Sequence, residues 1–152
     1  MSISIELPLP YYQKKGRALM TLNVYRNAHH HTQSAFKRMY GQICLNALFD
    51  ANIKKTFTCV SIEFVLHTLP TKGKPIKADP YRGSVPKNID LSNALAVVDK
   101  TFCDIVVTQG GIPSDTITHI QRVVYESEPW ATRDYITVVI TEITPKTDPR
   151  RS

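Results

Sequence analysis

The sequence predicts an α+β fold in which a mixed sheet of about four strands has two main helices covering one face. Three observations support this prediction. Alternating apolar residues indicate strands near both ends and in the middle of the chain, and apolar residues at helical spacing indicate two helices between them. The 152 residues suit one domain, and the 42% hydrophobic content is enough for a core without disulfides or structural metal.

The first half of the chain begins with a strand and continues to a long helix. Apolar and polar residues alternate over residues 3–7, which predicts a strand that ends at Pro8 and Pro10. Residues 19–25 are expected to form a second short extended segment. Apolar side chains then recur at i, i+4, i+7 and i+11, which predicts an amphipathic helix over residues 32–50.

The second half repeats the change of period. Alternation over residues 56–69 predicts a strand, and helical spacing over residues 91–108 predicts a second helix that ends at the Gly-Gly pair 110–111. Residues 116–126 and 135–143 are rich in β-branched residues and alternate again. An antiparallel pair is the simplest arrangement for these last two strands.

Residues 1–145 are expected to form a single domain, and residues 146–152 a flexible tail. A Pro- and Gly-rich loop at about residues 70–89 carries the single acid Asp79 against five basic residues, namely Lys72, Lys74, Lys77, Arg82 and Lys87. Its net charge of +4 within a chain of +6 points to a polyanion partner such as nucleic acid. A merely solvated surface loop explains the same charge equally well.

Several classes of protein are disfavoured by absent patterns. The longest apolar run has five residues, far below the roughly 18 of a membrane helix, and the start of the chain lacks the pattern of a signal peptide. We therefore expect a cytoplasmic protein whose three cysteines are reduced core residues. No G-x-x-x-x-G-K-[ST], G-x-G-x-x-G, G-x-S-x-G or H-E-x-x-H pattern occurs, so no nucleotide cofactor is expected.

The histidines give a weaker signal. The run His29-His30-His31 looks like a metal tract, but consecutive residues of a regular element are not expected to converge on one ion. Solvated or DNA-facing imidazoles are the favoured interpretation. His67 and His119 fall on predicted strands, where a satisfied core or cross-strand histidine is the usual explanation.

Two carboxylates lie at the ends of predicted elements. Asp90 follows the basic loop at the start of the second helix, and Asp115 follows the Gly-Gly turn before a strand. A convergent pair of aspartates with open coordination positions would suit Mg²⁺ and phosphodiester hydrolysis. From spacing alone, an N-cap at Asp90 and a turn residue at Asp115 are the favoured roles.

Four segments, in order along the chain, resemble the RusA-type Holliday junction resolvases, a family of phage and prophage endonucleases. Residues 3–10 resemble the opening strand with its proline stop, and Asp90-Leu91-Ser92-Asn93 resembles the D-x-[DS]-N motif that opens the catalytic helix. Residues 114–124 resemble the D-D-x-x-V segment, and residues 135–142 resemble the final strand. The resemblance implies a RusA-like fold and a homodimer that cleaves four-way DNA junctions with Mg²⁺.

The resemblance also implies roles for individual residues. Asp90 and Asp115 would bind Mg²⁺, with Ser92 and Asn93 supporting the site. The chain departs from the family pattern because Ser92 replaces a common second Asp, and the family lysine six residues after the first Asp is also missing. Lys100 lies one helical turn beyond that position, and we infer that its ammonium takes over the catalytic role.

The predicted function is therefore Mg²⁺-dependent, structure-selective cleavage of branched DNA in phage recombination, repair or genome processing, in the host cytoplasm. The basic loop and Lys37 or Arg38 would contact phosphates without reading sequence. An alternative is a non-catalytic DNA-binding protein on the same scaffold, and a third is a protein that binds another polyanion. Asp99 and Asp104 are expected to be solvated charges or members of local ion pairs.

Overall fold

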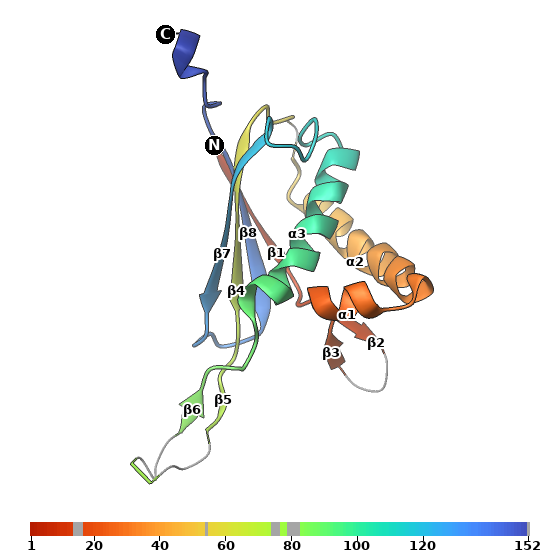
Figure 1. The fold of residues 1–152 in the computed structure, drawn as a ribbon, viewed down its shortest axis with the longest axis vertical. Helices are drawn as coiled ribbons and strands as arrows, with labels where there is room; N and C mark the ends of the chain where they lie inside the picture. The colour runs from red at the N-terminus through yellow and green to blue at the C-terminus, as the bar shows by residue number, and fades with distance from the viewer. Residues whose placement is uncertain (14–16, 54, 74–76, 79–82, 152) are drawn as a thin grey trace.

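The structure is a computed structural model that describes residues 1–13, 17–53, 55–73, 77–78 and 83–151. The chain forms a four-stranded mixed sheet with its helices on one face (Figure 1). This arrangement confirms the predicted α+β class and the helical cover on a single face. Within the described ranges, no helix is long and apolar enough to cross a membrane.

The sheet has the strand order β1-β8-β4-β7. Its members are β1 (Ser2–Leu7), β4 (Val60–His67), β7 (Ile120–Glu128) and β8 (Tyr135–Glu142). β8 pairs antiparallel with both β1 and β4, whereas β4 and β7 run parallel. The crossover between the two parallel strands includes the long helix α3, as a parallel connection requires.

The predicted pairing of the last two strands with each other is wrong, because β4 lies between them. β4 is buried along most of its length, including Ser61 and His67 on the face away from the helices. β4 is an interior strand, with β8 on one side and β7 on the other. The more exposed β7 consequently takes the edge.

The segment between β1 and the first long helix contains a hairpin and a short helix. β2 (Tyr11–Gln13) pairs antiparallel with β3 (Arg17–Leu19), and α1 (Leu22–Asn27) follows. The expected extended segment over residues 19–25 is therefore wrong from Leu22 on, where α1 begins. The reason is a local N-cap, since the Thr21 hydroxyl accepts a hydrogen bond from the Val24 amide at 3.3 Å.

The two long helices agree with the sequence prediction. α2 (His30–Asp50) begins two residues early, and α3 (Leu91–Thr108) has the expected bounds. Gly110 has φ of +75°, a conformation that glycine adopts without steric cost, and it lies just beyond the end of α3. The core fills the space between these helices and the sheet, with contacts such as the edge-to-face pair Phe64 and Phe102.

The three cysteines are free thiols buried in the protein, as predicted. Burial raises the pKa of the Cys44 thiol to about 12. Almost no thiolate is present at neutral pH in such an environment, so Cys44 packs as a small apolar side chain.

Two segments project from the body of the domain at opposite ends (Figure 1). At one end, β5 (Thr71–Lys72) and β6 (Ser84–Val85) form a two-stranded antiparallel hairpin. At the other end, the chain after β8 leads to η1, a 3-10 helix over Pro149–Arg151. We call the hairpin of residues 71–85 the basic arm.

Candidate nucleic-acid interface

The basic arm projects beyond one end of the sheet, where β5 and β6 lie (Figure 1). Its strands pair Thr71 with Val85 and Lys72 with Ser84, and the Gly73 amide donates to the Gly83 carbonyl at 2.5 Å. The hydrogen bonds of β5 and β6 in the described part of the arm join these strands only to each other. The arm is thus a paired ribbon held away from the core.

The described part of the basic arm carries two lysines. Lys72 and Lys77 are exposed, and no ion pair occupies either ammonium among the described residues. Lys74 and Arg82, which the sequence also assigns to DNA binding, lie outside the described residues. Exposed, unpaired ammonium groups on a projecting ribbon are available to phosphate oxygens.

Lys87, which the sequence also assigns to DNA binding, makes an ion pair within the chain. Its ammonium donates to both carboxylate oxygens of Asp134 at 2.7 Å, and the two side chains are only 26% and 25% exposed. Asp134 also accepts a hydrogen bond from the Leu69 amide at 2.7 Å. Lys87 therefore fastens the base of the arm to the turn between β7 and β8, and its charge is already neutralised.

The ionisation of Asp134 reflects this anchoring. Partial burial raises the pKa of its carboxyl, but the hydrogen bond from Lys87, the Leu69 amide and the charge of Lys87 together outweigh burial. The net result is that the pKa of Asp134 lies below its ordinary value. The carboxylate therefore stays charged at neutral pH and keeps the ion pair intact.

The start of α3 contains three of the residues predicted for the catalytic site. Asp90 is the N-cap, and its Oδ1 accepts from the Asn93 amide at 3.0 Å and from the Ser92 hydroxyl at 3.1 Å. The Asn93 side chain accepts a hydrogen bond from the Asn23 amide in α1 at 3.0 Å. These contacts assign clear structural roles, because Asp90 satisfies an unpaired helical amide and Asn93 joins α1 to α3.

Asp115 and Lys100 lie elsewhere on the same helix and its exit loop. Lys100 is exposed on α3, and Asp115 is exposed in the loop between α3 and β7. Asp90 precedes the first turn of α3 and Asp115 follows its last turn, and no hydrogen bond or ion pair among the described residues joins the two side chains.

Asp115 has different acidic neighbours. Its charge acts on the pKa of the Cys103 thiol together with the charges of Asp99 and Asp104, so the three carboxylates share the neighbourhood of that thiol. Asp104 and Asp115 are exposed, and within the described ranges neither carboxylate accepts a hydrogen bond or makes an ion pair. Their side chains are free to bind a cation.

Asp99 corrects the expectation of a solvated charge. It is half-buried between α3 and β7, where Oδ1 accepts from the Cys103 thiol at 3.2 Å and Oδ2 accepts from the Tyr125 hydroxyl at 2.5 Å. Burial, followed by these contacts with Asp99, raises the pKa values of Cys103 and Tyr125. Both groups keep their protons, so the cluster connects a helix to the edge strand without reactive chemistry.

The open face of the sheet carries a polar network centred on His67. Its ring nitrogens lie 2.5 Å from a carboxylate oxygen of Glu128 and 2.8 Å from the Thr137 hydroxyl, and the ring stacks on Tyr135. The predicted role of a cross-strand histidine with satisfied hydrogen bonds is confirmed. The guanidinium group of Arg133 lies over the Tyr135 ring, with Cζ 3.9 Å from the ring centroid.

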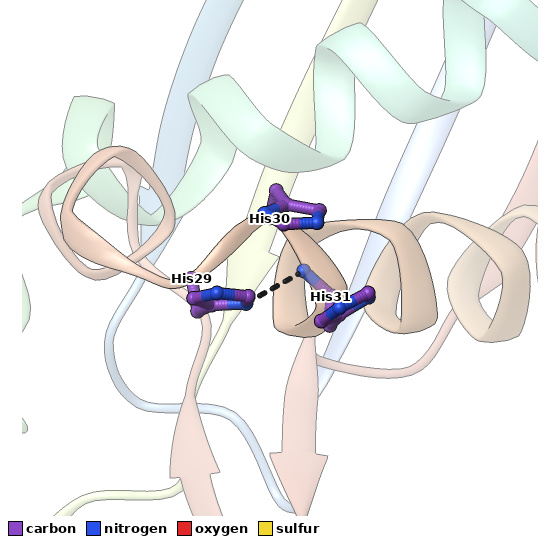
Figure 2. Close-up of side chains that lie close together, drawn as sticks. All are labelled: His29, His30 and His31. Atoms are coloured by element: carbon purple, nitrogen blue, oxygen red, sulfur yellow. Dashed lines mark hydrogen bonds between the residues drawn. The ribbon is translucent and has the colours of Figure 1, made fainter.

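Among the described residues, one group of at least three side chains has metal-ligating atoms close together, and it consists of His29, His30 and His31 (Figure 2). All three are exposed, and one ring nitrogen from each lies within 4.8 Å of the others. The expectation that these residues cannot converge is wrong, because His29 precedes α2 as its N-cap and is not part of the regular helix.

Comparison with known proteins gives no assignment, since no family model matches the chain and no curated protein matches it. Function is therefore inferred from the geometry described above and from the short motifs of the sequence.

Proposed function

We propose that the protein binds DNA through the basic arm. The observation that carries this proposal is a two-stranded ribbon, projecting from the domain, with Lys72 and Lys77 exposed and unpaired among the described residues. The major groove of B-DNA admits a two-stranded β-ribbon, and lysine ammonium groups contact phosphates without sequence preference.

The way the arm is attached supports the same proposal. The ion pair between Lys87 and Asp134 holds its base, so the arm keeps its direction relative to the sheet. A ribbon with a fixed base loses less conformational freedom on binding than an unanchored loop does. The charge of the rest of the chain also favours a polyanion, since α2 exposes Lys37 and Arg38 and the net charge is +6.

The test is binding of a labelled four-way junction and a matched linear duplex, measured by fluorescence anisotropy. The Lys72→Ala, Lys77→Ala double variant should bind both DNAs more weakly than the parent. A control with the same loss of charge is Lys146→Ala, Arg151→Ala, whose exposed side chains lie in the C-terminal segment at the opposite end of the molecule. Equal weakening in both double variants would show that only net charge matters.

A second candidate function is Mg²⁺-dependent cleavage of the bound DNA, as the resemblance to resolvases implies. The observation in its favour is the pair of exposed, unpartnered carboxylates Asp104 and Asp115. Lys100 is exposed four residues before Asp104, which places the two on one face of α3. On this proposal the two aspartates hold Mg²⁺ and Lys100 neutralises charge on the scissile phosphate.

Cleavage is tested with the same junction, with and without Mg²⁺. Asp115→Asn should abolish product, whereas Asp90→Ser should not, because serine keeps the N-cap and removes only the carboxylate. If Asp90→Ser no longer cleaves the junction, Asp90 is a metal ligand after all. If the parent protein binds the junction but does not cleave it, DNA binding is the whole function. A four-way junction is two-fold symmetric in outline, so paired nicks also require a homodimer, which light scattering measures.

A further inference from the structure

The three histidines at the start of α2 have no part in the proposed DNA contact, yet their rings gather on the surface (Figure 2). Ring centroids are 4.3 Å apart for His29 and His30, 4.1 Å for His30 and His31, and 4.9 Å for His29 and His31. We propose that these side chains form a surface site for a divalent transition-metal ion of the kind that prefers nitrogen ligands, with Zn²⁺ as the representative ion.

The backbone explains how three consecutive residues converge. His29 has φ of −58° and ψ of 146°, so it lies outside the helix, and its Nδ1 accepts a hydrogen bond from the His31 amide at 3.2 Å. This bond folds the His29 ring back over the first turn, where His30 and His31 begin the regular helix. The change from extended to helical backbone between His29 and His30 brings the first ring to the other two.

The distances are within reach of coordination. Zn²⁺ binds imidazole nitrogen at about 2.0–2.1 Å, so three nitrogens on one ion lie roughly 3.3 Å from each other. The ligand nitrogens now lie within 4.8 Å of one another, and all three side chains are exposed. Rotation of exposed side chains closes this difference without any movement of the core.

The ligand set selects the class of ion. Three imidazoles with solvent in the remaining positions suit Zn²⁺, Ni²⁺ or Cu²⁺, whereas Mg²⁺ and Ca²⁺ require oxygen ligands. No carboxylate belongs to this group of described residues, so it offers Mg²⁺ no side-chain oxygen ligand. The histidine site should therefore not bind Mg²⁺, the ion that the second candidate function requires. The two metal sites can thus be tested separately.

Binding has a defined consequence for His29. In the free protein its Nδ1 accepts the hydrogen bond from the His31 amide, so the neutral ring carries its own proton on Nε2. Coordination through Nε2 moves that proton to Nδ1, and the bond to the His31 amide is lost.

The experiment is calorimetric titration of the full chain with Zn²⁺ at pH 7.5. We expect one ion per chain, with the dissociation constant rising more than about tenfold in each of His29→Asn, His30→Ala and His31→Ala, and binding lost in the triple variant. Asparagine caps a helix at least as well as the residue it replaces, so His29→Asn separates a lost ligand from a frayed helix. His119→Gln, a histidine outside the group, should bind as the parent does.

Clear outcomes overturn the proposal. Unchanged affinity in the triple variant would place the ion elsewhere, and absence of Zn²⁺ binding in the parent would remove the site. One ion per two chains would mean that two copies share it, which contradicts a three-ligand site within one chain. Mg²⁺ should give no heat from this site in any variant.

Discussion

Asp90 shows how a single carboxylate at the start of a helix stabilises the structure around it. Its oxygen caps α3 by accepting from the Asn93 amide. We expect Asp90→Ala to lower the free energy of unfolding by about 1 kcal/mol, and Asp90→Ser to leave it nearly unchanged, because serine also caps. Urea unfolding measures both. Equal stability of the alanine and serine variants would show that the capping bond contributes nothing.

Lys87 provides a second prediction at the same scale. Lys87→Ala should lower the free energy of unfolding by about 1 kcal/mol at pH 7, since a partly buried carboxylate loses its charged partner. The same variant should not change the salt dependence of DNA binding, because the Lys87 ammonium is already paired with Asp134. Chemical unfolding and anisotropy titration measure the two properties. A flatter salt dependence in Lys87→Ala would instead make this lysine a phosphate contact.

The ionisation of Asp134 determines how the stability of Lys87→Ala depends on pH. Its pKa is lower in the folded chain than in the unfolded chain, whose value is about 3.9. The ion pair therefore stabilises the fold above about pH 4, and its contribution is lost as the pH falls through the folded pKa. The stability difference between the parent and Lys87→Ala should narrow in acid, whereas a constant difference would rule out the ion pair as its cause.

At the scale of elements, the basic arm is separable from the domain. Replacing residues 71–85 by a short Gly-Ser linker should leave cooperative thermal unfolding within a few degrees of the parent, because the described hydrogen bonds of β5 and β6 are made within the arm. The same variant should bind DNA much more weakly. Circular dichroism and anisotropy measure the two effects. Loss of the folded state would show that the arm is part of the core.

The elements also show how far sequence periodicity reaches. The bounds of α3 were predictable because apolar spacing, an N-cap at Asp90 and a glycine beyond the last turn all agree. The pairing of β7 with β4 was not, since the alternation within a strand does not show which strand lies beside it. Thr21 was likewise overlooked, and with it the short helix that it caps.

At the scale of the whole molecule, the charge pattern of the sequence indicates the projecting basic arm, on which the proposed DNA interface rests. The cluster of lysines marked the projecting arm because unpaired charge belongs at the surface. Spacing could not show whether Asp90, which precedes α3, and Asp115, which follows it, approach each other. Nor could it show that Asp134, 47 residues away in sequence, pairs with Lys87.

The salt dependence of DNA binding tests the central proposal most directly. Plotting log K against log salt concentration between about 50 and 200 mM should give a steep line for the parent. Each lost phosphate contact flattens the slope by about 0.9 for duplex DNA, so Lys72→Ala, Lys77→Ala should flatten it by about 1.8. The control Lys146→Ala, Arg151→Ala should keep the parent slope. An unchanged slope in the arm variant, with the arm still folded, would contradict the proposal that the basic arm binds DNA.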